Sequence, residues 1–523
     1  MTIKRKACIA GAYEHPTRKA PDKTVAQLHA ECARGALADA GLTLQDVDGY
    51  FCAGDAPGLG ANNMADYLGL TKLRHIDTTD TGGSAYLIHV SHAAQAIAAG
   101  KCDVALVTLA GRPRSEGSSG VAPRLVTANT PDVPWEMPYS PVIVNMYALA
   151  AARHMHEYGT TSEQLAWIKV AAAAHAQHNP NAMLREPVTV EEVLASPMIS
   201  DPLHKLDCCV VSDGGGALVV VRPEIAARLK RPVVNILGAG ETIKGQLGGH
   251  VDLTWSGAAI SGPIAFKEAG VSPADIQYAS IYDSFTITVL MQLEDLGFCK
   301  KGEGGRFVAD GNLISGVGTL PFNTDGGGLC NDHPANRGGI TQVIEAVRQL
   351  RGAAPAKDQV PDCTLALAQG TGGLLGSRHG SATLIMERQE AMTTPYTERP
   401  LAPVTVDAAT EHFWTQAKEG LLCTRRCTSC GEVHWYPRAL CPFCMGDTEW
   451  CSLSGLGTIY SVSVTRRAGP IAYAIAYVAL DEGITLLTNI VDCDFDDLKI
   501  GQRVEVPFKP AEGGAMVPMF KPA

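Results

Sequence analysis

Apolar and polar positions follow one another in two kinds of segment along most of the chain. Residues 24–53 carry an Ala- and Leu-rich stretch of helical spacing, then a glycine, a loop and a short strand-like run. Residues 77–111 carry a turn of small residues, a long helical stretch, a glycine and a continuous apolar run. Uninterrupted apolar runs are typical of strands that are covered on both faces. The pattern therefore predicts an α/β fold in which helices cover both faces of a sheet.

The same order of segments occurs twice. Residues 261–285 repeat the order of residues 24–53, with Asp275 in the place of Asp46, and residues 326–369 repeat the order of residues 77–111. Self-similarity of this kind indicates a duplicated fold rather than two unrelated ones. Between the two copies we expect an insertion, at about 112–230, which forms a lobe that covers substrate.

A proline-rich stretch without helical or strand period, residues 392–407, interrupts the pattern. We interpret it as a linker. The sequence then predicts four parts: a first domain at 1–391, the linker at 392–407, a cysteine-rich module at 408–450 and a run of short strands at 451–523. Glycine and acidic turns divide these strands, which favours a small Greek-key barrel.

Composition narrows the classes of function. The 523 residues are 46% hydrophobic, so the chain can bury a large core, and 43 basic against 54 acidic residues give a net charge of −11. This balance disfavours a protein that coats nucleic acid or an anionic membrane. No apolar run reaches the roughly 18 residues of a membrane span, and the first residues turn polar early. We therefore expect a soluble, cytoplasmic protein.

Four of the sixteen cysteines form a metal-binding pattern. Cys427 and Cys430 are separated by two residues, as are Cys441 and Cys444, and ten residues lie between the two pairs. Two such knuckles bring four thiolates to tetrahedral distance around a zinc ion. Because four cysteines leave no open coordination position, we expect the zinc to be structural.

Residues 1–390 resemble the thiolase superfamily, in particular its sterol-carrier-protein type. The matching segments are EYGTTSEQLA, AHAQHNPNA, SDPLHKLDCCVVSDGGGA, IYDSF and DHPANRGGITQVIEAVRQLRG. The resemblance implies a five-layered α-β-α-β-α core, usually dimeric, that handles acyl-CoA thioesters. The C-terminal part resembles the zinc-ribbon/OB-fold family that accompanies acyl-CoA enzymes, so we expect a docking or tunnel-shaping role for it. OB folds often bind nucleic acid, but acidic residues outnumber basic ones in this part and no basic aromatic stripe is present, so we expect no nucleic-acid binding.

The sequence departs from the thiolase pattern at the catalytic positions. The resemblance places Thr79 where thiolases have their nucleophilic cysteine, and a threonine hydroxyl without a strong base is a poor substitute for a thiolate. It places Tyr282 at the second catalytic position, where the phenol can donate a proton and where a nearby cation or oxyanion hole could lower its pKa enough for it to accept one. At the third catalytic position, His333 provides the imidazole that thiolases also have there. At the fourth, the backbone amide of Gly372 is expected to form an oxyanion hole with that of Thr79.

A site that polarises a thioester without a nucleophile fits retro-aldol cleavage of a β-hydroxyacyl-CoA. The products are a ketone or aldehyde and a shorter acyl-CoA, and no covalent acyl-enzyme forms. We expect Tyr282 to transfer the proton of the β-hydroxyl group and His333 to stabilise the enolate oxygen. Coenzyme A enters as part of the substrate. This chemistry coincides with the thiolase-like aldolases of steroid side-chain degradation, which the resemblance also suggests.

Two other functions stay open. An acyltransferase could use another thiol, such as Cys330 or Cys102, and a non-catalytic acyl-CoA-binding module could act beside a hydratase. The remaining histidines and cysteines near the motifs are expected to be structural: His75, His89, His92, Cys208 and Cys209. The acyl group and the residues that bind coenzyme A are left open by the sequence.

Overall fold

The structure, a computed structural model, divides the chain into two compact units, Met1–Gln389 and Glu390–Ala523. It describes residues 2–54, 56–118, 131, 133–229, 231–334, 338–389, 396–466 and 471–523, without the side chain of residue 133. Residues 392–395 of the expected linker and 119–130 of the expected lobe lie outside the described residues. None of the helices described is both long and apolar enough to cross a membrane.

A nine-stranded sheet runs through the first unit in two halves. The N-terminal half has the order β3 (His75–Asp77), β2 (Gly49–Phe51), β4 (Val104–Gly111), β7 (Gly214–Val221) and β1 (Cys8–Glu14). The C-terminal half continues with β8 (Val234–Lys244), β11 (Arg378–Arg388), β10 (Leu365–Leu374) and β9 (Tyr278–Ile281). Only the first residues of β1 and β8 pair across the junction.

The two halves repeat one topology. In the N-terminal half, β1 pairs antiparallel with β7, β7 pairs antiparallel with β4, and β4 pairs parallel with the short strand β2. In the C-terminal half, β8 pairs antiparallel with β11, β11 pairs antiparallel with β10, and β10 pairs parallel with the short strand β9. Local turns repeat as well: Asp46 accepts hydrogen bonds from the amide and hydroxyl of Thr43, and Asp275 accepts the same two from Ser272. The predicted duplication is confirmed.

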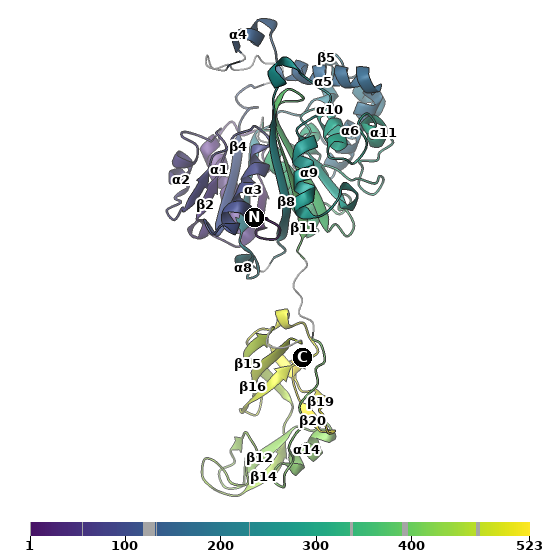
Figure 1. The fold of residues 1–523 in the computed structure, drawn as a ribbon. Helices are drawn as coiled ribbons and strands as arrows, with labels where there is room; N and C mark the ends of the chain where they lie inside the picture. Colours follow the sequence, from purple (N-terminus) through teal and green to yellow (C-terminus); the bar gives the residue numbers. More distant parts are fainter. Residues whose placement is uncertain are drawn as a thin grey trace. The chain divides into compact units, whose positions relative to one another are not determined.

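Helices form three layers around the two half-sheets (Figure 1). The helices α3 (Ala85–Ala98) and α13 (Gly339–Arg351) contact strands of both halves and therefore form the central layer. On the outer faces, α1 (Val25–Ala40) and α2 (Ala61–Leu68) pack on the N-terminal half, and α9 (Ala258–Ala269) packs on β8 and β11. Separate apolar cores fill the central and the two outer interfaces. This is the expected five-layered arrangement.

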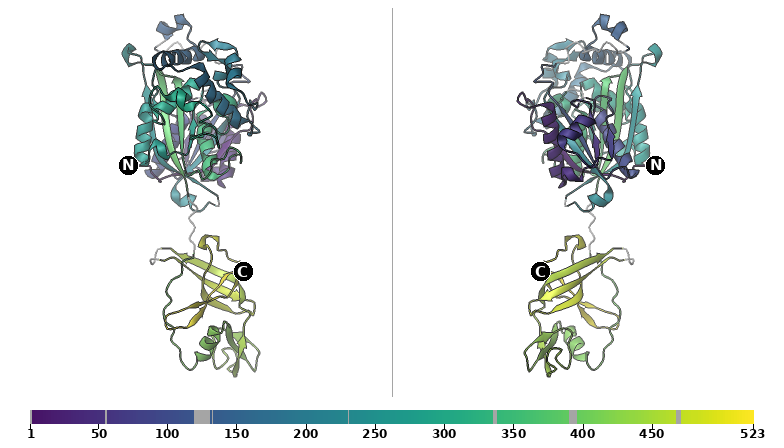
Figure 2. Two further views of the ribbon diagram at one scale, coloured as in Figure 1. Left: turned by 90° about the vertical axis from the view of Figure 1, so that its right-hand side faces the viewer. Right: turned by 90° about the vertical axis from the view of Figure 1, so that its left-hand side faces the viewer.

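The insertion is mostly helical and gathers at one end of the first unit (Figure 2). Its elements are α4 (Val133–Glu136), α5 (Ile143–Tyr158), α6 (Ser162–Ala176), α7 (Val190–Ala195), β5 (Met198–Ser200) and β6 (Leu203–His204). The helices α10 (Thr286–Asp295) and α11 (Gly304–Val308) pack against α6. The expected lobe boundary near 230 is wrong, because β7 is fully buried within the sheet and α8 (Pro223–Ala226) follows it directly.

The second unit contains a cysteine-rich ribbon and a barrel. The ribbon consists of β13 (Val433–His434), β12 (Cys423–Cys427) and β14 (Thr448–Ser452), preceded by α14 (Glu411–Lys418). The barrel sheet has the order β17 (Thr485–Ile490), β16 (Tyr473–Leu480), β15 (Leu456–Thr465), β18 (Arg503–Glu505) and β21 (Lys521–Pro522). A hairpin of β19 (Phe508–Pro510) and β20 (Met516–Pro518) adjoins it. A bridge between Ile490 and Phe520 closes the barrel.

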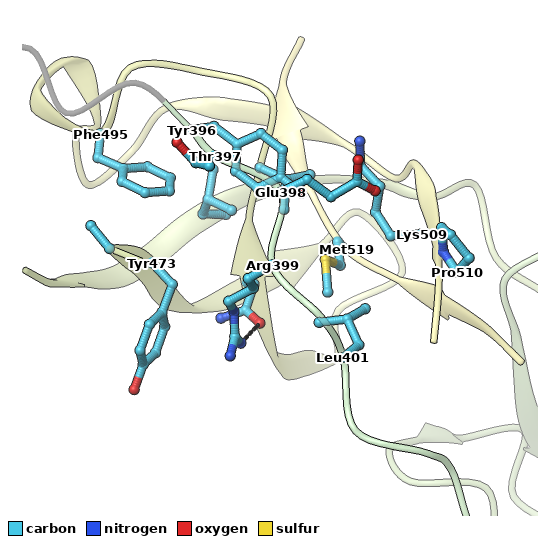
Figure 3. Close-up of a pocket in the computed structure, with 14 residues that line it drawn as sticks. Tyr396, Thr397, Glu398, Arg399, Leu401, Tyr473, Phe495, Lys509, Pro510 and Met519 are labelled. Atoms are coloured by element: carbon cyan, nitrogen blue, oxygen red, sulfur yellow. Dashed lines mark hydrogen bonds between the residues drawn. The ribbon is translucent and has the colours of Figure 1, made fainter. Parts of the chain in front are cut away.

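Part of the expected linker is packed on this barrel (Figure 3). The amide of Tyr396 donates to the carbonyl of Cys493 at 2.9 Å. The Arg399 guanidinium lies 4.4 Å from the ring centroid of Tyr473 and donates to Asn489 at 2.9 Å. A cavity of only about 10 Å³ remains beneath this stretch, roughly the room for one water. The segment 396–401 is therefore part of the second unit.

Candidate active site

Tyr282 lies immediately after the end of β9. Its amide donates to the carbonyl of Gln369 at 2.9 Å, and its carbonyl accepts from the side chain of Gln292 at 2.8 Å, so its backbone is fixed on two sides. The side chain is buried, with 4% of the residue exposed. A Cβ at Gly83 would come within 2.3 Å of the Tyr282 ring, so the ring occupies space that only glycine leaves free.

His333 faces Tyr282. The two rings meet edge to face, with centroids 5.4 Å apart and an interplanar angle of 77°. The backbone amide of His333 donates to the Ser212 hydroxyl at 2.9 Å. Its Nε2 is buried and has no hydrogen-bond partner in the described part of the chain. Burial lowers the pKa of His333 to about 4, so the imidazole is neutral at neutral pH with one ring nitrogen open.

The environment of Tyr282 leaves the phenol protonated. Burial raises its pKa well above the usual value, and the neighbouring Tyr147, Cys209 and Asp283 add to the shift. None of the causes of the shift lowers the pKa, so the expectation that a cation could lower it is not met. The phenol is therefore a proton donor, or one member of a relay, rather than a standing phenolate.

Thr79 is tied to the aspartate two residues before it. Its amide and its hydroxyl both donate to Asp77 Oδ1, at 2.8 and 2.7 Å. Although burial alone would raise the pKa of Asp77, hydrogen bonds from His92 and Thr79 hold it well below the usual value, so this carboxylate is a weak base. The expected oxyanion donor is corrected accordingly: the Thr79 amide is already occupied. The Thr79 hydroxyl also has no base that could activate it among its partners.

Gly372 lies in β10 against the turn that follows Thr79. A Cβ at this position would approach the carbonyl oxygen of Thr81 to 2.0 Å and the amide nitrogen of Gly83 to 2.6 Å. Gly83 in turn contacts the Tyr282 ring. The structure thus brings the backbone at Gly372, the glycine turn, Tyr282 and His333 together.

One residue near Tyr282, Tyr147, was missed by sequence reasoning, and Cys209, which was expected to be structural, lies nearby as well. Tyr147, from α5 of the insertion, donates to the carbonyl of Gly373 at 3.1 Å, and its ring centroid lies 4.5 Å from that of Phe285. The amide of Cys209 donates to the carbonyl of Ser284 at 2.9 Å. Burial raises the pKa of Tyr147 to about 12. No local pattern marks Tyr147, because its contacts lie on segments that are distant in the sequence.

The two thiols considered as alternative nucleophiles, Cys330 and Cys102, are not activated. Cys330 and Cys102 are both completely buried. Burial raises the pKa of Cys102 to about 12, and it also raises that of Cys330, although Lys169 opposes the shift. The Cys330 sulfur accepts from Lys169 Nζ at 3.1 Å. At neutral pH these side chains are protonated thiols without access to solvent.

The four predicted zinc ligands converge in the second unit. The Sγ atoms of Cys427, Cys430, Cys441 and Cys444 all lie within 4.8 Å of one another. Two of the pairs, Cys427 with Cys444 and Cys430 with Cys441, are 3.5 and 3.6 Å apart, near the ~3.8 Å edge of a tetrahedron with zinc–sulfur bonds of about 2.3 Å. The donor set therefore fits zinc, and with four sulfur ligands the ion is structural.

Three family models match the chain. One described as thiolase C-terminal domain-like matches residues 240–388. The rubredoxin-like zinc ribbon domain of ChsH2 matches residues 414–450, and the C-terminal OB-fold domain of ChsH2 matches residues 450–509. The zinc ribbon and the OB fold predicted from the sequence are confirmed.

Three relatives match this chain over nearly their whole length. An acetyl-CoA acetyltransferase of Methanothermobacter thermautotrophicus is 32% identical over 71% of this chain and 98% of the relative. A steroid side-chain-cleaving aldolase of Thermomonospora curvata is 37% identical over 66% and 90%. A 17-hydroxy-3-oxo-4-pregnene-20-carboxyl-CoA lyase of Mycobacterium tuberculosis is 34% identical over 66% and 92%.

Among solved structures, one named Ltp2-ChsH2(DUF35) aldolase is similar to this chain. It has a TM-score of 0.66 and 34% identity, and the match covers 74% of this chain and 98% of that one. The zinc ribbon and OB-fold matches also belong to ChsH2. A single polypeptide here carries both a thiolase-like unit and domains of the ChsH2 type.

Proposed function

Because this chain belongs to the thiolase superfamily, we propose that it cleaves the Cα–Cβ bond of a β-hydroxyacyl-CoA by a retro-aldol reaction. The products are a ketone or aldehyde and a shorter acyl-CoA. One observation carries the proposal: the nucleophile position holds Thr79, whose amide and hydroxyl are both bound to Asp77, while a buried phenol faces a neutral imidazole nearby. Such a site can move protons and polarise a carbonyl, but it offers no group for acyl attachment.

Tyr282 acts as a neutral proton relay. In the net reaction the β-hydroxyl loses a proton and becomes a carbonyl, while the electrons of the Cα–Cβ bond, with enolate charge developing on the thioester oxygen, end in a new Cα–H bond. The phenol oxygen takes the hydroxyl proton while the phenol gives its own proton toward Cα. No phenolate has to form, which agrees with the raised pKa of Tyr282.

His333 holds the enolate oxygen. Its Nε2 is buried and has no hydrogen-bond partner among the residues that the structure describes, so in the tautomer that carries a proton there it can donate to an oxyanion. The low pKa of His333 keeps the ring neutral, and the ring donates without becoming an acid that competes with Tyr282. Backbone amides of the turn near Gly372 are the further candidates for this oxygen.

The names of the relatives supply the substrate class. Two of the three, and the similar solved structure, are named as aldolases or lyases, and one of those names specifies a CoA thioester. Their steroid substrates make a bulky acyl chain the first to test. A hydratase that adds water to an enoyl-CoA would supply the β-hydroxy group, and the first unit is expected to form a homodimer.

Product detection tests the proposal. The full-length protein is incubated with β-hydroxyacyl-CoAs that carry steroid, aromatic or branched acyl chains, and the released carbonyl compound and shortened acyl-CoA are measured by mass spectrometry. Tyr282→Phe should lower kcat by at least about 100-fold with little change in melting temperature, because it removes the relay proton only. Tyr158→Phe, at the end of α5, is the matched control and should leave kcat unchanged.

The acetyltransferase among the relatives is the reason to test a second candidate function, acyl transfer. An acyltransferase would leave an acyl group on a thiol during turnover, and iodoacetamide would label that thiol and abolish activity. Recovery of acylated Cys330 or Cys102 would replace the aldolase proposal with this one. Binding of acyl-CoA without turnover, unaffected by Tyr282→Phe or His333→Ala, would instead favour a non-catalytic binding module.

A further inference from the structure

The strand end that carries Tyr282 is held by the loop that carries His333, residues 323–333. Asn323 pairs with the backbone of Ile281, the residue before Tyr282. The Ile281 amide donates to Asn323 Oδ1 at 2.8 Å, and Asn323 Nδ2 donates to the Ile281 carbonyl at 2.8 Å. The loop therefore holds the backbone on one side of the phenol.

Asp283, the residue after Tyr282, binds the same loop through its side chain. Its Oδ1 accepts from the amide of Gly328 at 2.7 Å, and its Oδ2 accepts from the amide of Leu329 at 3.1 Å. Both amides belong to the single-turn helix α12 (Gly327–Cys330), and a carboxylate at that end is favoured by the unsatisfied N–H groups. The residues on both sides of Tyr282, Ile281 and Asp283, are thus hydrogen-bonded to the same loop.

A buried lysine binds the opposite end of α12. Lys169, which is 1% exposed, donates through Nζ to the carbonyl of Leu329 at 2.7 Å and to Cys330 Sγ at 3.1 Å. The short helix therefore lies between a carboxylate at its amide end and an ammonium group at its carbonyl end. This arrangement fixes the helix, and His333 follows it three residues later.

Packing leaves little freedom between Asp283 and His333. A Cβ at Gly328 would lie 2.8 Å from Asp283 Oδ1 and 2.9 Å from His333 Cδ2. The carboxylate and the imidazole therefore flank the same glycine, and displacement of the carboxylate changes the space available to the imidazole.

We infer that Asp283 is a positioning residue that sets the relative placement of Tyr282 and His333 through helix α12. Its side chain is bound to backbone amides, so it acts through the two candidate catalytic side chains rather than on substrate. The inference rests on the proposed function, in that Tyr282 and His333 must act together on one substrate. Misplacement by about 1 Å in such a pair can cost on the order of 100-fold in rate.

The charge of Asp283 adds a pH signature. Burial raises the pKa of Asp283 to about 7, although the amides of Gly328 and Leu329 oppose the shift. Below that pH the carboxyl gains a proton, and the hydrogen bonds that it accepts from the two amides weaken. The titratable groups around it are Tyr282, Asp325, Cys209, Cys330, Lys169 and His333. The wild-type rate should therefore fall as the pH drops through about 7.

Asp283→Asn tests the inference in the full-length protein. Asparagine keeps one acceptor oxygen and loses the charge, so it resembles the protonated carboxyl at every pH. We expect kcat at pH 8 to fall about 10- to 100-fold with KM within about threefold, and the acid limb near pH 7 to disappear. Asp48→Asn is the matched control, because Asp48 Oδ1 also accepts two backbone amides, those of Asp103 and Val104, away from the site.

A readout without turnover separates this inference from the proposed function. Carbethoxylation of His333 by diethyl pyrocarbonate, measured on its peptide by mass spectrometry, should be at least about fivefold faster in Asp283→Asn than in wild type or Asp48→Asn. Unchanged kcat, acid limb and modification rate in Asp283→Asn would overturn the inference. If wild type cleaves no β-hydroxyacyl-CoA, the proposed function fails and the modification rate alone decides whether Asp283 positions His333.

Discussion

Burial has opposite effects on the pKa values of the two candidate catalytic side chains and leaves both of them neutral. It raises the pKa of Tyr282 and lowers that of His333 to about 4, because the charged form is the costly one in each case. Neutral groups can donate or relay protons without changing the net charge of a closed site. Cleavage by these groups should therefore need no ionisation of either one between about pH 5 and pH 9.

Thr79 offers a direct test at the residue scale. We expect Thr79→Val to keep cleavage within about fivefold of wild type, since it removes only the hydroxyl bond to Asp77, which is worth about 1 kcal/mol. The measurement is kcat/KM for carbonyl release, together with the melting temperature. A loss of 100-fold or more would mean that the hydroxyl is a nucleophile after all.

Asp332 gives a pH-dependent prediction for stability. Its carboxyl oxygens are buried and have no hydrogen-bond partner among the described residues, and burial raises its pKa to about 8. A raised pKa means that the native state holds the proton more tightly, so stability is lost as the pH rises from about 4 to about 8. In Asp332→Asn this loss is absent.

Melting temperatures of wild type and Asp332→Asn, recorded from pH 4 to pH 8, check that sign. The difference should grow in favour of the variant as the pH rises, by about 1 °C for each kcal/mol gained in a unit of this size. A difference that is constant over this range would show that Asp332 does not titrate between the two states.

At the scale of elements, the glycine turn after β3 determines where the phenol can lie. A Cβ added at Gly83 would lie 2.3 Å from the Tyr282 ring and 2.5 Å from the carbonyl oxygen of Thr371. The turn, the strand end of β9 and the end of β10 thus meet at one point. Any side chain here forces one of these elements to move.

Gly83→Ala should accordingly lower the free energy of unfolding by about 2 to 3 kcal/mol and reduce cleavage more strongly than stability alone explains. Gly100→Ala is the matched control, because its Cβ would meet nothing within 4 Å and only its left-handed backbone, at φ 69°, is strained. Chemical denaturation and kcat of the folded protein provide the two measurements. Equal effects of the two substitutions would contradict the packing argument.

At the scale of the whole molecule, the two units have separate cores. The apolar cluster of the second unit contains residues from its helix α14, its ribbon and its barrel, with Tyr396 of the stretch 396–401 packed against them. Its ribbon is small, with three short strands, so metal binding contributes much of its stability.

Removal of zinc should therefore unfold the ribbon selectively. A strong chelator is expected to make the four ligand cysteines, Cys427, Cys430, Cys441 and Cys444, reactive to a thiol reagent and to change the fluorescence of Trp435 and Trp450. The thermal transition of the first unit should stay in place. A simultaneous loss of both transitions would mean that the ribbon is required for the first unit to fold.

The sequence was a good guide wherever the signal is local in the chain. The spacing of the four cysteines, the repeated order of helix and strand, and the turn with Asp46 and Asp275 each depend on a few neighbouring residues. The boundaries were less reliable: β7 lies inside the expected lobe, and the stretch 396–401 packs on the second unit instead of serving as a free linker. Both depend on which distant strand a segment meets.

By itself, then, the sequence determined the duplicated α/β architecture and the zinc ligands, and its resemblance to the thiolases made Thr79, Tyr282 and His333 the candidates at the catalytic positions. Only the tertiary structure decided the protonation states of Tyr282 and His333, the hydrogen bonds from Thr79 to Asp77, and the contacts that hold the backbone on both sides of Tyr282. The reason is physical: a pKa depends on how completely a group is removed from water, and that burial is produced by segments far apart in sequence. Tyr147 and Gly373, 226 residues apart, meet beside the site in this way.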